Sequence, residues 1–266
     1  MNPSAIRLEL RRSRTLVLWL GIITAAYAGF ITIFYSNVVD NAAAFEDLLK
    51  LYPKELMAAF GMEANFADPG VFLGGYVYNF LWPLVGAAAA IVLATRVAAD
   101  ADRGFLDIAL ATPITRSAYL LGSIVAQVVG VAILAAALVG AVLLGDLLIE
   151  PDFPAVSVAL STLHALAFGV AVAGPTTLLA ALFLDRGRAA GVAAGVLVLM
   201  YLLNVVGALA PEVEGVTIVS AFRYFDLKSL ISEGTYPIAD SVILAGVGVA
   251  GWALALYAFR RRDLAA

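Results

Sequence analysis

The side chains that could do nucleophilic chemistry are few in this chain. His164 is its single histidine, and Ser161 stands three residues earlier in STLHALAFG, on the same face of a helix. A serine beside a histidine base could support hydrolysis, which is the enzyme alternative for this sequence. The spacing is not specific, because a lone histidine on an apolar helix is more often a hydrogen-bonded packing residue. We therefore predict no catalytic residue.

The residues needed for a metal site and for nucleotide hydrolysis are also missing from this sequence. The chain has no cysteine and one histidine, which leaves too few ligands for a metal site. A phosphate-binding loop needs a glycine directly before its lysine, but Lys50, Lys54 and Lys228 follow Leu, Pro and Leu. We predict that the chain holds no cofactor and does not hydrolyse ATP by itself. Its basic patches are too small for nucleic acid.

The elements that must position any site are apolar. Of the 266 residues, 63% are hydrophobic and 14% are charged, against roughly 25% charge in soluble domains. Runs of about 20 apolar residues can cross the hydrocarbon core of a bilayer. We predict one all-α polytopic transmembrane domain over residues 1–266, with six transmembrane helices. Their ranges are 15–35, 71–94, 117–144, 156–184, 189–209 and 241–259.

The basic residues predict the orientation of these helices. Twelve of the sixteen Lys and Arg residues lie in the N-terminal segment, in 95–116, in 185–188 and at the C-terminus. Cytoplasmic loops carry such an excess. We therefore place both termini in the cytoplasm of a multi-pass protein of the cytoplasmic membrane.

The two long outer segments, 36–70 and 210–240, contain apolar residues at helical spacing, as in AAAFEDLLKLYPKELMAAFGM and SAFRYFDLKSLISEG. We predict amphipathic helices there, with Pro53 dividing the first segment. They either pack on the exterior of the protein or cover the outer mouth of a pathway.

The six spans contain no Asp, Glu, Lys or Arg. Ion-coupled transporters usually need such a residue in the membrane, so that class is disfavoured. Gly191 and Gly195 form a small-residue face on the fifth span. We favour packing within the chain for this face, with contact to a second copy as the alternative.

The loop 95–116 interrupts the apolar sequence with AADADRGFLDIALATPITR. Phe105, Leu106, Ala109 and Leu110 give a short helix one apolar face, and Asp100 or Asp102 could stabilise its start. A helix lying on lipid usually has a basic polar face. This loop has more Asp than Arg around the helix, which favours docking onto a protein partner.

The same loop resembles the cytoplasmic loop of ABC-2 type transporter permeases. The shared pattern is supplied by Asp102, Gly104, Phe105, Leu106, Asp107, Leu110, Thr112, Pro113, Ile114, Thr115, Arg116 and Tyr119. LYPKELMAAFGM, SAFRYFDLKSLI and FRRRDLAA resemble other family segments in the same order, so the resemblance covers nearly the whole chain. Asp102 replaces a common Glu, and Ser123 stands where a Lys often follows Gly122.

The resemblance implies that the loop is a coupling helix, which docks into a separate ABC ATPase subunit. Two such subunits, holding ATP and Mg, would drive a pair of permeases: two copies of this chain, or this chain and a paralogue. The implied docking residues are Asp102, Arg103, Gly104, Phe105, Leu106, Asp107, Pro113 and Arg116. Phe105 and Leu106 would form the apolar plug.

The resemblance also implies that spans two and five line the substrate route, where Tyr76, Asn79 and Asn204 are the polar candidates. The function implied is an exporter permease subunit in contact with membrane lipid. A non-transporting scaffold, sensor or immunity subunit with the same fold is the alternative. The sequence does not identify the substrate.

Overall fold

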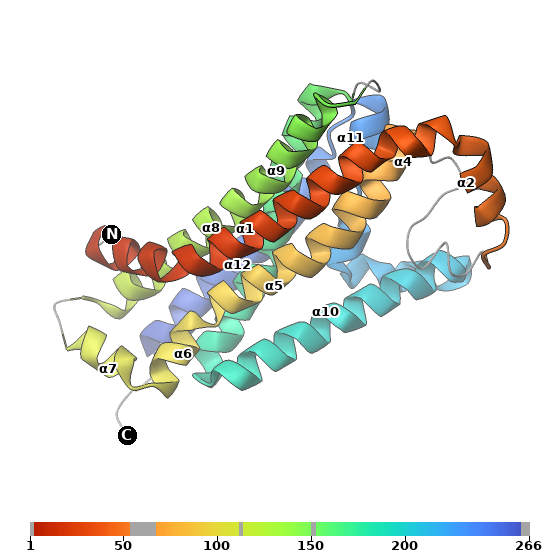
Figure 1. Cartoon of the computed structure of the whole chain (residues 1–266). Coiled ribbons are helices and arrows are strands. Elements are labelled where there is room, and N and C mark those ends of the chain that lie inside the picture. The colour runs from red at the N-terminus through yellow and green to blue at the C-terminus, as the bar shows by residue number, and fades with distance from the viewer. Residues whose placement is uncertain (1–2, 54–67, 112–113, 150–152, 262–266) are drawn as a thin grey trace.

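The computed structural model describes residues 3–53, 68–111, 114–149 and 153–261, which are almost entirely helical (Figure 1). Six helical stretches in these residues are long and apolar enough to cross a membrane, which confirms the predicted all-α polytopic class. They are α1 (Pro3–Asp40), the continuous stretch of α4 (Pro69–Leu73), η1 (Gly74–Leu81) and α5 (Trp82–Ala94), α8 (Arg116–Asp146), α9 (Ala155–Phe183), α10 (Arg186–Leu209) and α12 (Ile238–Arg261). Each stretch begins before the residue predicted from the sequence.

The largest difference from the expected ranges is in α1, which was expected over 15–35 and has 38 residues. At about 1.5 Å per residue it is roughly 57 Å long, nearly twice the hydrocarbon thickness. Its first turns can therefore lie outside the hydrocarbon core. This explains why the helix includes the basic segment 7–14 without interruption.

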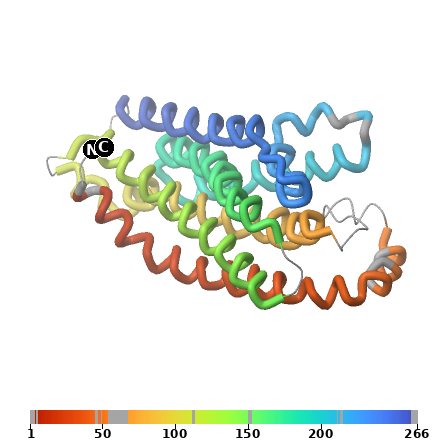
Figure 2. The backbone as a smooth tube through the Cα atoms, turned by 90° about the horizontal axis from the view of Figure 1, so that it is seen from above, coloured from red at the N-terminus to blue at the C-terminus, as the bar shows by residue number. Residues whose placement is uncertain are grey.

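The helices form an elongated bundle in which α1 packs along α8 and α12 packs along α9 (Figures 1 and 2). α8 and α9 also pack on each other, so they form the centre. α10 lies at the periphery. Only 11% of its most apolar stretch is buried, against 67% in α9.

The small-residue face of α10 does not pack within the chain, contrary to our expectation. Gly191 and Gly195 are both exposed. Within the described residues, no side-chain or neighbouring-helix atom lies within 4 Å of a Cβ placed on either glycine. The close helix contact is made instead by the glycines of α9 and α12.

The two ends of the bundle carry different elements. The start of α1 and the end of α12 lie at the same end as α6 (Arg96–Asp102) and α7 (Phe105–Leu110) (Figure 1). The opposite end carries α2 (Ala42–Leu49), η2 (Pro211–Val219), η3 (Ala221–Tyr224) and α11 (Lys228–Glu233). The short helix of the loop 95–116 therefore lies at the same end as the start of α1 and the end of α12, as the distribution of basic residues predicts. That this end is cytoplasmic stays a prediction.

The second outer segment packs on the bundle, whereas the described residues of α2 in the first are mostly exposed. Phe225, Leu227, Leu230 and Ile231 are all buried, which favours packing on the protein's own exterior. α2 occupies part of the first outer segment and ends before Pro53. The second helix expected there falls on residues 54–67, outside the described residues.

Candidate functional site

The segment between the second and third spans is built from two short helices with a break on each side of the first. Thr95, with φ −82° and ψ 4°, separates α5 from α6. Gly104, with φ +67°, separates α6 from α7. A left-handed backbone conformation of this kind costs an L-residue about 1–2 kcal/mol, which explains a glycine at this turn. α6 is therefore a short helix bounded on each side by residues outside helical geometry.

The side chains of α7 face in two directions. Leu106 is 2% exposed and packs in the chain's own core, so its side chain is not presented outward as the predicted plug would be. Phe105 is half-buried beneath the guanidinium of Arg12, which lies 5.0 Å from the ring centroid. Ile108, which was not among the predicted residues, is 67% exposed. The large apolar side chain that α7 exposes is therefore that of Ile108.

The exposed face of α7, as we use the term here, consists of Arg103, Gly104, Asp107 and Ile108. It combines one apolar side chain with one basic and one acidic side chain. Arg116 lies apart from it as the first residue of α8, which Thr115 caps by accepting a bond from the backbone N–H of Ala118. Pro113 lies outside the described residues.

The two aspartates near the end of α6 bind other helices rather than the start of α7. The Gly104 position that precedes α7 has no side-chain capping bond. Asp102 accepts a hydrogen bond of 2.9 Å from the backbone N–H of Arg186, the first residue of α10. Asp100 is 1% exposed and belongs to a buried cluster. The helix-start role considered for Asp100 and Asp102 is therefore not what the structure shows.

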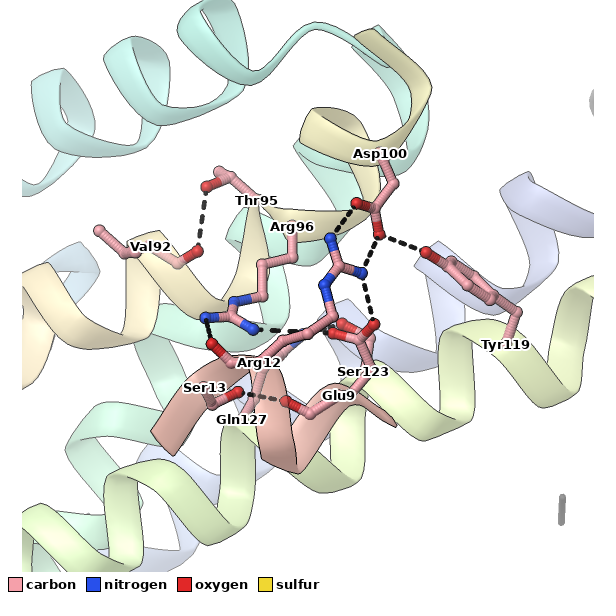
Figure 3. Close-up of polar contacts among 10 residues, drawn as sticks. All are labelled: Glu9, Arg12, Ser13, Val92, Thr95, Arg96, Asp100, Tyr119, Ser123 and Gln127. Carbon is pink, nitrogen blue, oxygen red and sulfur yellow. Dashed lines mark hydrogen bonds and ion pairs between the residues drawn. The ribbon is translucent and has the colours of Figure 1, made fainter. Parts of the chain in front are cut away.

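That buried cluster, which we call the ionic cluster, consists of Glu9, Arg12, Arg96, Asp100 and Tyr119 (Figure 3). Arg12 donates to both oxygens of Asp100, at 2.9 and 2.5 Å, and to Glu9 Oε1 at 3.0 Å. The Tyr119 hydroxyl also donates to Asp100. Arg96 Nη2 donates to the backbone carbonyl of Arg12 at 3.0 Å. The cluster joins α1, α6 and α8.

The electrostatics of the cluster are balanced, because two carboxylates face two guanidinium groups. Glu9 and Asp100 are 2% and 1% exposed, so each would be costly to leave without its partner. Removing one member of such a buried pair typically costs about 3–5 kcal/mol. Burial lowers the pKa of Arg96 although Glu9 raises it, and an arginine side chain remains charged at neutral pH.

Sequence reasoning missed the ionic cluster. Glu9 and Arg12 have the i, i+3 spacing of a helical ion pair, which was the available local signal. The other partner of Arg12, Asp100, is 88 residues away from it in the chain. Pairing at that separation depends on how the helices pack, which no local pattern shows.

The polar residues proposed for a substrate route are divided between two elements. Tyr76 and Asn79 lie in η1, a π-helical segment of the second span, where the Tyr27 hydroxyl donates to the Tyr76 carbonyl at 3.4 Å. Asn204 lies on α10. The buried Asn79 Oδ1 has no hydrogen-bond donor among the described residues. π-helical segments frequently mark functional sites, although within the described residues no hydrogen bond joins Asn79 to Asn204.

The histidine is held by hydrogen bonding and ring packing. His164 Nδ1 lies 2.7 Å from Ser241 Oγ, and its ring stacks on Phe225 at 5.3 Å. Ser161, the candidate nucleophile, donates to the Val158 carbonyl at 2.6 Å, and its Oγ lies 2.7 Å from the Tyr78 hydroxyl, which can donate to it. The structure therefore does not pair Ser161 with His164. In the part of the chain that the structure describes, no group of His, Asp or Glu side chains is arranged to hold a metal.

Comparison with known families adds one finding to this geometry. The model of a family described as ABC-2 family transporter protein matches residues 6–264. The match extends from the first turns of α1 to just beyond α12. A search of the curated proteins finds no match to the chain.

Proposed function

The chain belongs to the ABC-2 family of transporter proteins, and from this premise we propose that it is the permease subunit of an ATP-driven exporter. In this proposal a separate ABC ATPase subunit binds ATP and Mg²⁺ and hydrolyses the nucleotide. The permease contributes the membrane path and holds no nucleotide itself. It acts in the cytoplasmic membrane, with α6 and α7 on the cytoplasmic side.

The exposed face of α7 carries this proposal. It lies at the end of the bundle that also holds the start of α1 and the end of α12 (Figure 1). Its exposed residues are Ile108, Arg103 and Asp107. An apolar side chain with flanking charges suits insertion into a groove on a soluble protein. Leu106, predicted as part of the apolar plug, packs inward, so the proposal assigns the docking contact to Ile108 instead.

The proposal also includes a second permease, either another copy of this chain or a paralogue, and two ATPase subunits. The unpartnered glycines of α10 support the second permease. Small residues let transmembrane helices approach closely, whereas lipid tails pack as well against larger side chains. Gly191 and Gly195 leave open space on an exposed helix face, which a second transmembrane helix could fill.

Co-purification tests the docking face directly. Tagged wild type, Ile108→Asp and Ile238→Asp would be isolated from native membranes in mild detergent. Ile238 is the matched control, because it is 68% exposed, close to the 67% of Ile108, and begins α12 at the opposite end of the bundle. We expect wild type and Ile238→Asp to retain an ABC ATPase, and Ile108→Asp to lose it.

The outcome separates the candidate functions. Absence of an ATPase from the wild-type preparation would contradict the permease proposal. If an ATPase is retained, inverted membrane vesicles containing the complex are compared with and without ATP, by mass spectrometry of their lipids and small solutes. An ATP-dependent change supports an exporter. No change in either pool favours the scaffold, sensor or immunity alternative.

A further inference from the structure

α6 is attached to three other helices by polar side chains, and to its own neighbours in the chain only through non-helical residues. Thr95 precedes it, and Arg103 and Gly104 follow it, all outside helical geometry. Asp100 binds α1 and α8, and Asp102 binds the first residue of α10. α6 is also held by apolar packing, because Val97, Ala98 and Ala99 are buried. The polar bonds are what join α6, and α7 after it, to α1.

We propose that the ionic cluster makes α6 and α7 move together with α1, so that Asp100 and Arg12 are positioning residues that carry a displacement of α7 into the membrane bundle. The proposal rests on the proposed function in so far as an ATPase supplies that displacement. The cluster itself is a property of this chain and can be tested without a partner.

The contacts of Arg12 explain why α1 is the helix that moves when α6 and α7 are displaced. Its guanidinium binds Asp100 of α6 through two nitrogens, and it lies over the Phe105 ring of α7. One side chain of α1 therefore contacts both short helices. Two parallel N–H···O bonds fix an angle as well as a distance, so they transmit rotation, which a single contact would not. Arg96 adds a bond in the opposite direction, from α6 to the backbone of α1.

The cluster also has a spare acceptor. Glu9 Oε2 is buried and has no hydrogen-bond partner among the described residues, and Arg96 Nη1 lies 3.9 Å from it. A shift of about 1 Å would bring that pair to hydrogen-bonding distance. A small side-chain adjustment can therefore add an Arg96–Glu9 bond between α6 and α1 while Arg12 keeps Asp100, so the two helices stay joined when they move. The cluster can follow a displacement without leaving a buried charge unpaired.

Distance measurements between spin labels test the link in the full chain alone. The protein has no cysteine, so labels can be placed on introduced cysteines without background. Leu18→Cys on α1 and Ile108→Cys on α7 are both at exposed positions and report the distance in question. A second pair, Leu18→Cys and Ile133→Cys on α8, reports whether α1 remains packed on α8.

Each pair is measured in wild type, Asp100→Asn, Tyr119→Phe and Asp107→Asn. We expect a narrow distance distribution between positions 18 and 108 in wild type, a several-fold wider one in Asp100→Asn and an intermediate one in Tyr119→Phe, which keeps all charges. Asp107→Asn is the matched control, because it removes the same charge from an exposed site of α7 outside the cluster. The distance between positions 18 and 133 should not change.

Two results overturn the proposal. One is an unchanged 18–108 distribution in both Asp100→Asn and Tyr119→Phe. The other is equal broadening of both label pairs, which would show a general role in folding. If Asp100→Asn does not fold, Tyr119→Phe alone decides, and an unchanged 18–108 distribution in that variant overturns the proposal.

Activity provides the second readout, in the purified complex with unlabelled protein. We expect Asp100→Asn to retain the ATPase, because the exposed face of α7 is intact, and to lower transport per ATP hydrolysed about tenfold. A retained ATPase with unchanged transport per ATP contradicts the proposal. If wild type retains no ATPase, the proposed function fails, while the label distances still decide the inference.

Discussion

Two helix faces of this bundle carry glycines, and the structure uses them in opposite ways. Where α9 meets α12, a Cβ placed on Gly174 would overlap the backbone of Gly248, and one on Gly248 would overlap the carbonyl of Val170. On α10, a Cβ on Gly191 or Gly195 would meet no atom of the described residues within 4 Å. One pair of glycines closes a contact, and the other leaves space open.

The difference shows what a small residue contributes in a membrane. Lipid tails are as apolar as leucine, so burying an apolar side chain against another helix gains little there. Helix contact is stabilised instead by close packing and hydrogen bonds, and glycine permits the closest approach. A glycine spacing therefore indicates a capacity for contact, and the bundle determines whether the partner lies in the same chain.

The largest effect is expected from breaking the closed contact. Gly248→Val places a branched side chain against the backbone of α9 at Val170. Because no flexible side chain can move aside to make room, the helices must separate, at a cost of about 3 kcal/mol or more. The free energy of unfolding in mixed micelles, measured by titration with SDS, should fall accordingly.

Gly246→Val is the control for this change. Gly246 lies two residues earlier on α12, is exposed and has open space around its Cβ position. It should lower the free energy of unfolding by much less. Equal losses in the two variants would show that valine weakens α12 as a helix, and that the α9 contact is not the cause.

A smaller loss is expected from the polar bonds beside the same contact. Gln127 Oε1 on α8 accepts hydrogen bonds of 3.0 Å from both Thr177 of α9 and the Trp252 indole of α12. Gln127→Leu leaves the buried indole N–H without this acceptor, and should cost about 1–2 kcal/mol in the same titration. Ser123→Ala, which removes only the weaker 3.3 Å contact with Gln127, should cost less. A larger loss in Ser123→Ala than in Gln127→Leu would contradict the role of Gln127 as the acceptor that joins these helices.

The open glycines predict an effect on association and none on the fold. The double variant Gly191→Val, Gly195→Val should leave the free energy of unfolding of the monomer nearly unchanged. If α10 contacts a second copy, the dissociation constant of the dimer should rise about tenfold, equivalent to about 1.4 kcal/mol. Energy transfer between labelled copies, diluted in lipid bilayers, measures that constant. Gly246→Val again serves as control, and an equal rise there would argue against a specific α10 contact.

The sequence predicted the parts of this molecule that local patterns determine. The six spans followed from runs of apolar residues, and the family assignment from the motif around Gly104 and Pro113 was confirmed by the family match. The spacing of Phe105 and Leu110 predicted a helix where α7 lies. These features depend on residues near one another in the chain.

The parts it did not predict depend on which helices become neighbours. Leu106 was predicted to face a partner and Ile108 was not, but the packing of α7 buries Leu106 and exposes Ile108. The local sequence favoured a helix-start role for Asp100, but the packing of α1 and α8 brings Arg12 and Tyr119 to it. The glycines of α10 and α12 have comparable sequence surroundings, so their opposite environments could not be distinguished. The charged start of α1 was excluded from its span because the expected range followed hydropathy alone.

The smallest predicted effect comes from replacing glycine by alanine on α12. It is the most sensitive test of the two glycine faces, because the change in the free energy of unfolding should have opposite signs at positions 246 and 248. Alanine favours helix over glycine by about 1 kcal/mol in water, through the lost flexibility of the unfolded backbone. Gly246→Ala adds a methyl group to open space, so the free energy of unfolding should rise slightly. Gly248→Ala gains the same helix preference but must displace the backbone of α9, so here the free energy of unfolding should fall. A rise in both variants would mean that the α9–α12 contact yields easily to one methyl group, and that the two glycine faces differ less than their geometry indicates.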